Sequence, residues 1–85
     1  MIWTLIYLQQ AQDQLANIWL QAPDQSDVTL AADLLEKQLR DDPYSYSSFA
    51  RHDSSRIMVE SPLATGYDVD DGDRKVTVWA FWRLN

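Results

Sequence analysis

Two consecutive segments in the first half of the chain each carry apolar residues at three- and four-residue steps. The first stripe is Leu8, Ala11, Leu15, Ile18, Trp19 and Ala22, and the second is Val28, Ala31, Leu34, Leu35 and Leu39. Pro23 and Pro43 interrupt this spacing, which predicts one helix from Gln9 to just before Pro23 and another from Asp24 to near Asp41. Because each helix has a single apolar stripe, both must bury it against the same surface.

Four other segments have the composition or the alternation of β-strands. Residues 1–8 are rich in aromatic and β-branched side chains, residues 56–60 alternate, and residues 63–69 and 75–83 follow as further strand candidates. The pair Asp71-Gly72 predicts a tight hairpin turn in which the glycine takes a positive φ. The order β-α-α-β-β-β predicts an α+β domain, with an antiparallel four-stranded sheet and both helices on one face.

These layers also predict a core. We expect the following residues to be buried: Leu15, Ile18, Trp19, Ala31, Leu35, Leu39, Ile57 and Val59. The last strand is apolar on both faces, with Val76, Val78, Ala80 and Trp82 on one and Thr77, Trp79 and Phe81 on the other. We therefore expect one face of this strand to pack against the helices and the other to face a second surface. The polar stretch 43–54 is expected to be a loop that packs on the domain.

Length and composition exclude several classes of protein. A chain of 85 residues makes one core, so we expect a single domain over residues 1–85. The absence of cysteine excludes a disulfide framework, thiolate zinc sites and thiol catalysis, and it fits the cytoplasm. A net charge of -6 disfavours bulk electrostatic binding of nucleic acid and of anionic membranes. The apolar start has no basic region and is too short to span a bilayer, so we expect neither a signal nor an anchor.

The titratable residues form no recognised catalytic or metal-binding pattern. The acidic run at 68–73 resembles a calcium loop, but Gly72 and Trp79 occupy positions where that loop needs a ligand and a closing glutamate. His52 is the single histidine and has no spacing to a serine that would make a relay. We therefore predict no metal site and no cofactor, and we identify no catalytic residue.

The arginines and aromatic residues of the second half are more informative. Arg51, Arg56 and Arg83 lie at predicted strand ends, where they either keep sheet edges soluble or form a phosphate-contact site. The aromatic group of the last strand is Trp79, Phe81 and Trp82. These rings either belong to the core or bind bases or an apolar partner. Four tryptophans are hard to place inside so small a core, so we expect at least one at an interface.

Several soft motifs carry a family resemblance. They are LRDDP at 39–43, arginines ahead of a short strand, SPLATGYDV at 61–69 and RKVTVWAFWR at 74–83. With the element order, they resemble the RelE/ParE family of toxins from bacterial type II toxin–antitoxin modules, over nearly the whole chain. The resemblance implies two N-terminal helices on one face of an antiparallel sheet and a partly concave opposite face. It also implies growth inhibition, plasmid stabilisation and neutralisation by a cognate antitoxin.

The resemblance implies two different activities. RelE-like members cleave ribosome-bound mRNA at the concave face, and ParE-like members poison DNA gyrase. Arg56 matches the family's arginine at the second strand, Arg51 a basic or polar residue before it, and Arg83 falls near the C-terminal functional positions. Ala64 and Asp68, however, replace residues that are commonly basic, and the last strand ends without histidine or tyrosine.

We therefore expect a toxin component whose activity is weak or lost. The alternatives are a ribosome-dependent mRNA endoribonuclease and a small non-toxic protein-interaction module. For the toxin, we expect the antitoxin to lie across the open sheet face and to contact Trp79, Phe81 and Trp82.

Overall fold

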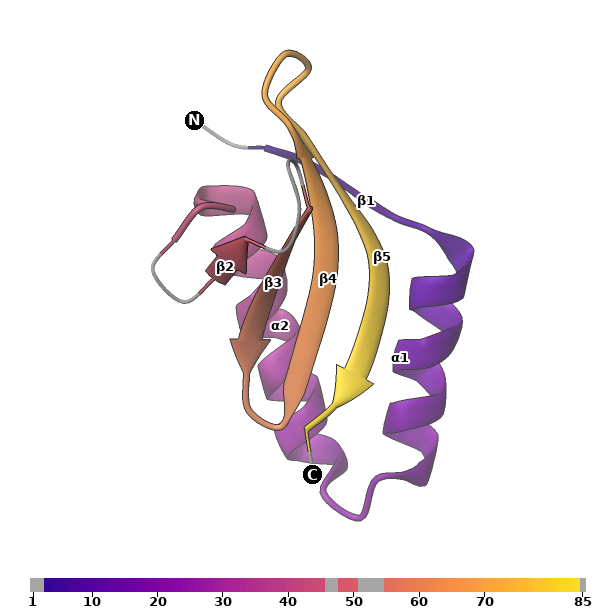
Figure 1. Ribbon diagram of the computed structural model, residues 1–85. Helices are drawn as coiled ribbons and strands as arrows, with labels where there is room; N and C mark the ends of the chain where they lie inside the picture. The colour runs from indigo at the N-terminus through magenta and orange to yellow at the C-terminus, as the bar shows by residue number, and fades with distance from the viewer. Residues whose placement is uncertain (1–2, 46–47, 51–54, 85) are drawn as a thin grey trace.

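The computed structural model describes residues 3–45, 48–50 and 55–84, which form two helices and five strands (Figure 1). In chain order the elements are β1 (Thr4–Tyr7), α1 (Gln9–Gln21), α2 (Gln25–Asp41), β2 (Ser48–Ala50), β3 (Ser55–Glu60), β4 (Leu63–Asp70) and β5 (Lys75–Arg83). Both helices end where the prolines predict. Within the described residues, no helix has the length and apolar character needed to cross a membrane.

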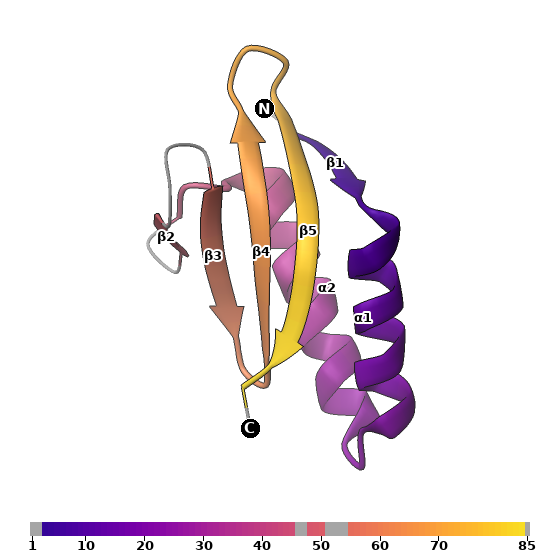
Figure 2. The same ribbon diagram turned by 45° about the vertical axis from the view of Figure 1, so that its right-hand side comes forward.

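The strands form one sheet in the order β1-β5-β4-β3-β2. Both helices lie on the same side of it (Figure 2), which confirms the predicted α+β layers. The sheet differs from the prediction in two respects. β2 is a fifth strand, formed inside the stretch expected to be a loop, and it pairs with β3. β1 runs parallel to β5, whereas the other neighbours are antiparallel.

The core fills the space between the helices and the sheet. From the expected set, Ala31, Leu35 and Leu39 are buried, and Leu15 and Ile18 are partly buried. The described core residues are Trp3, Ala11, Val28, Ala31, Leu35, Leu39, Met58, Leu63, Tyr67, Val69, Val76, Val78 and Phe81.

Two parts of the core prediction were wrong. Trp19 is 40% exposed on the helix side. In β3 the buried side chain is Met58, whereas Ile57 and Val59 are only partly buried. The Ile57 and Val59 phase is the more apolar of the two, but the pairing with β4 places the other phase, with Met58, toward the helices. Met58 pairs with Thr65, on the face of β4 that carries Tyr67 and Leu63.

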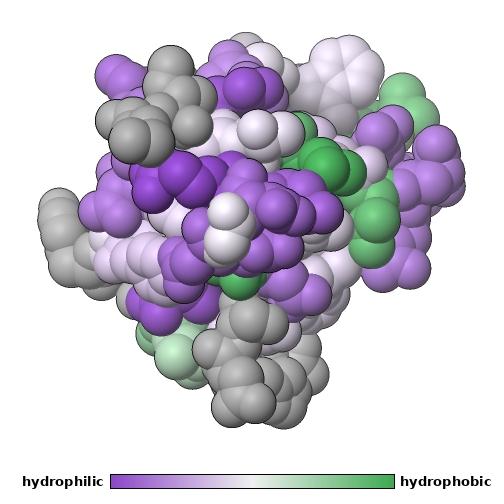
Figure 3. All heavy atoms as spheres, turned by 90° about the horizontal axis from the view of Figure 1, so that it is seen from above, coloured by the Kyte–Doolittle hydropathy of each residue, from purple (hydrophilic) through white to green (hydrophobic). Residues whose placement is uncertain are grey.

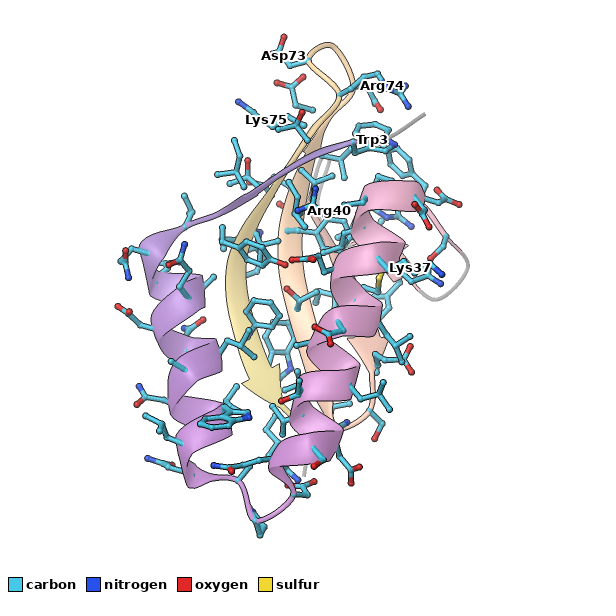
Figure 4. All side chains as sticks on the ribbon, turned by 180° about the vertical axis from the view of Figure 1, so that it is seen from behind. Trp3, Lys37, Arg40, Asp73, Arg74 and Lys75 are labelled. Atoms are coloured by element: carbon cyan, nitrogen blue, oxygen red, sulfur yellow. The ribbon has the colours of Figure 1, made fainter. Side chains whose placement is uncertain are left out.

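The β4–β5 turn also differs from its prediction. Neither glycine of the chain has a positive φ, and Arg74 takes that conformation instead, with φ 51°. The turn spans four residues, so its left-handed position falls at the end of the loop, beyond Gly72. The guanidinium carbon of Arg74 lies 4.4 Å from the ring centroid of Trp3, and the two side chains lie together at the hairpin end (Figure 4).

A buried hydrogen bond connects the sheet to the end of α2. The Tyr67 hydroxyl donates to the Pro43 carbonyl at 2.6 Å, and both residues are buried. We expect Tyr67→Phe to lower the free energy of unfolding by about 1–3 kcal/mol, because the buried carbonyl loses this donor. Urea denaturation followed by circular dichroism measures the loss.

Tyr44→Phe is the matched control for this variant. The wild-type Tyr44 hydroxyl also donates a hydrogen bond, to Asp71 Oδ2 at 2.9 Å, but Tyr44 is 44% exposed. Its loss should cost about 0.5 kcal/mol or less. Equal costs for the two variants would show that burial does not strengthen the Tyr67 contact.

Candidate functional site

Neither described helix covers the other face of the sheet, which we call the open face. Strand alternation and pairing place the following residues on it: Ile6, Phe49, Ile57, Val59, Ala64, Gly66, Asp68, Thr77, Trp79, Ala80 and Trp82. Phe49 is 53% exposed and Ile6 is 40% exposed, while Trp79 and Trp82 are partly buried. This face is the candidate site because it presents large apolar side chains with no helix over them.

A β-bulge in β5 decides which aromatic rings reach the open face. Tyr67 pairs with Val78 and Gly66 pairs with Ala80, so Trp79 is an extra residue between two ladder positions. Beyond the bulge, the inside and outside phases of β5 are exchanged. Trp82 therefore lies on the open face, and Phe81 points toward the helices.

Phe81 must accordingly be removed from the predicted group of open-face anchors. Its side chain is only 4% exposed and belongs to the core. The ring stacks on Tyr7 with centroids 6.0 Å apart, and its backbone N–H donates to Gln14 Oε1 at 3.0 Å. The strict alternation assumed from the sequence failed because the bulge adds one residue to β5.

The indole of Trp79 lies directly against Gly66. A Cβ added to Gly66 would be 2.6 Å from both Cζ2 and Cη2 of the indole, a distance that real Cβ atoms essentially never show. The close approach therefore needs glycine at this position. Gln10 of α1 donates from Nε2 to the Trp79 carbonyl at 2.7 Å, which fixes the bulge from the other side of the strand. The sequence analysis did not identify Gly66 or Gln10 as site residues. An isolated glycine inside a strand is nevertheless a known signal for a bulge or a close contact.

Charge is unevenly distributed along the open face. Asp68 and Asp70 lie exposed at the end nearest the β4–β5 turn, and Asp71 and Asp73 follow in the turn. Ser55 donates a hydrogen bond to Asp68. Hydrophilic residues dominate the surface seen from this end (Figure 3). A face that is acidic at one end and apolar at the other suits apolar and basic partner groups better than a phosphate backbone.

The structure does not bring the predicted phosphate-contact arginines together. Arg56 pairs with Tyr67 and Arg83 pairs with Leu63, so they are four positions apart along β4. This separation is about 13 Å at ~3.3 Å per residue. Arg51 lies outside the described residues, and so does His52.

Both described arginines of this group have intramolecular contacts. The guanidinium carbon of Arg56 lies 5.1 Å from the centroid of the Tyr44 ring. Arg83 Nη2 donates to Asp24 Oδ2 at 2.8 Å, and this hydrogen bond holds the pKa of Asp24 below its usual value. Asp24 stands at the N-cap of α2 but makes no side-chain capping hydrogen bond, and its Oδ2 binds Arg83 instead.

The described residues contain no group of three or more His, Cys, Asp or Glu side chains placed to hold a metal ion. Tyr7 is a titratable group near the core. Burial, with a smaller effect from Glu36, raises the pKa of its phenol, so the hydroxyl stays neutral and acts as a donor.

Comparisons with known proteins identify the fold. No protein-family model and no curated protein matches the sequence. Among solved structures, a chain of the RelBE2 toxin–antitoxin complex from Mycobacterium tuberculosis superposes with a TM-score of 0.78 at 12% identity, covering 98% of this chain and 99% of that one. The chromosomal ParDE TA system from P. aeruginosa gives 0.69 at 14% identity, with 99% and 98% covered. The isolated E. coli RelE toxin gives 0.65 at 17% identity, with 98% and 85% covered.

At these identities the similarity shows the fold alone. The chain has a RelE/ParE-like toxin fold, as its sequence resemblance implied. Its open face carries two partly buried tryptophans and an acidic end.

Proposed function

We propose that this protein is the toxin component of a toxin–antitoxin pair and that a cognate antitoxin neutralises it by covering the open face. The fold supports this proposal, because it matches chains of the RelBE2 and ParDE assemblies over 98–99% of their length and a RelE toxin over 85% of its length. The cytoplasm is the expected compartment for such a pair.

The observation that carries the proposal is the apolar open face. Ile6, Phe49, Trp79 and Trp82 occupy one side of the sheet, on which no described helix lies. Solvent-facing aromatic residues of this kind supply the anchors that dominate many protein interfaces. The acidic end beside them favours an antitoxin segment that is neutral or basic where it contacts this chain.

The charge pattern favours toxicity by binding over RNA cleavage. Attack by a ribose 2′-hydroxyl needs a base, an acid and cations around the phosphate. Asp68 lies on the open face, and Arg56 and Arg83 are at different ends of β4. Ribosome-dependent mRNA cleavage is therefore the second candidate activity. The experiments below test the ribosome as a target, and DNA gyrase is the alternative target.

Expression of the chain alone should stop bacterial growth, and co-expression of a small open reading frame beside its gene should restore growth. The same cells provide the test of cleavage by mapping of mRNA ends on translating ribosomes. We expect weak or absent cuts, because a missing acid or base costs about 10²–10⁴-fold in rate.

Two results would contradict these expectations. Robust cuts in the ribosomal A site that disappear in Arg56→Ala would make the protein an mRNA endoribonuclease. Normal growth at high expression, with a folded protein, would favour the non-toxic interaction module.

A further inference from the structure

The helix side of the molecule has a second apolar surface, a groove of about 470 Å³ between α1 and α2. Leu15, Ala16 and Trp19 line it from α1, and Val28 and Ala32 line it from α2. Figure 4 shows the two helices apart across the sheet, with side chains between them. We call this surface the helix groove, and it lies on the other side of the sheet from the open face.

An aromatic residue is fixed near each end of the helix groove. Trp19 Nε1–H donates to Thr29 Oγ1 at 3.0 Å, yet the side chain remains 40% exposed. The Tyr7 hydroxyl donates to Glu36 Oε1 at 3.3 Å. Thr29 and Glu36 are seven residues apart on α2, which is about 10 Å along the helix axis. The groove is thus preformed over two helical turns.

An exposed leucine extends this surface toward the start of α2. Leu30 is 58% exposed. A shallower hollow, lined by Gln25 and Leu30 among others, shares Trp19 and Thr29 with the helix groove. The surface between Gln25 and Glu36 is about 16 Å long, which matches three turns of a partner helix.

The edge of the groove is acidic. Asp33 and Glu36 line it, and among its described lining residues there is no Lys or Arg. Arg40 approaches Glu36 with Nε 3.9 Å from Oε2, but both side chains are almost half exposed, so this pair is weak. A cation from a partner can therefore replace Arg40 beside Glu36 at little cost in free energy. A second copy of this chain would bring its own acidic edge and a net charge of -6.

We propose that the helix groove docks one basic amphipathic helix, whose apolar stripe fills the groove and whose Lys or Arg residues pair with Asp33 and Glu36. Helix-in-groove recognition uses anchors at this spacing, and the charges fix orientation and specificity. The proposal goes beyond the toxin assignment and does not depend on it, because the two surfaces lie on opposite sides of the sheet.

The probe is a labelled 14-residue helical peptide with a leucine stripe and lysines elsewhere, compared with the same peptide carrying glutamates for lysines. Fluorescence anisotropy with the full chain should show binding of the lysine peptide, and the glutamate peptide should bind at least about tenfold more weakly. Equal affinities would overturn the charge argument.

Two pairs of variants locate the peptide. Ala16→Phe fills the groove, whereas Asn17→Phe adds the same ring at the next, exposed position of α1. Asp33→Lys reverses a charge at the groove, whereas Asp73→Lys makes the same change in net charge in the β4–β5 turn. We expect the first member of each pair to weaken binding about fivefold or more and the second to change it less than about twofold.

Trp79→Ala separates the two faces, because it alters only the open face. It should bind the lysine peptide like the wild type. Loss of binding in Trp79→Ala together with normal binding in Ala16→Phe would place the peptide on the open face and overturn the proposal. Circular dichroism of each variant confirms that the fold is intact.

Discussion

Gly66→Ala should lower the free energy of unfolding by about 1–3 kcal/mol, although alanine ordinarily improves a strand position held by glycine. The added Cβ would meet the indole of Trp79 at 2.6 Å, so the ring must move off the sheet and lose its contacts. Urea denaturation of the purified variant measures the change. The effect is large because the ring is partly buried and its backbone is held by Gln10.

The control is the same substitution in a Trp79→Ala background. Without the indole, the three atoms nearest to the new methyl group are removed, and Gly66→Ala should become neutral or stabilising by about 0.5–1 kcal/mol. The difference between the two backgrounds is the coupling energy of the pair. An equal cost in both backgrounds would show that the contact between Gly66 and Trp79 does not determine this position.

The helices could be predicted well because their signals are local. Apolar stripes and prolines give α1 and α2 to within a few residues of their observed ends, and the layered arrangement follows from one stripe per helix. Pairing between distant strands is not a local property. The parallel alignment of β1 with β5 and the three-residue strand β2 therefore could not be derived from periodicity.

The candidate site was predicted only in part, for a similar reason. One face of the last strand packs toward the helices and the other lies on the open face, but Ala80 and Trp82, which were predicted on the face of Val76 and Val78, lie on the open face with Trp79. Phe81 was misplaced because one bulged residue reverses every later side chain of the strand. Arg56 and Arg83 both sit near strand ends in the sequence, but β3 and β5 are both antiparallel to β4 and run the same way, so the start of β3 and the end of β5 lie at opposite ends of the sheet.

Trp79→Ala should weaken binding of the cognate antitoxin by about 2 kcal/mol or more, which is roughly 30-fold in Kd. The indole lies across the middle of the open face, above Gly66 and between the apolar and acidic ends, so an antitoxin segment that crosses this face must contact it. Isothermal titration calorimetry with the purified product of the neighbouring gene measures the change.

Trp19→Ala is the matched control, because it removes the same side chain from the opposite side of the molecule, where the indole is 40% exposed. Its affinity for the antitoxin should stay within about twofold of the wild type, because truncating a side chain outside the interface removes no contact with the antitoxin. Equal affinities of Trp79→Ala and the wild type for the antitoxin would show that Trp79 is not an anchor for it. A loss confined to Trp19→Ala would instead place the antitoxin in the helix groove, so the pair of variants decides which of the two apolar surfaces the antitoxin uses.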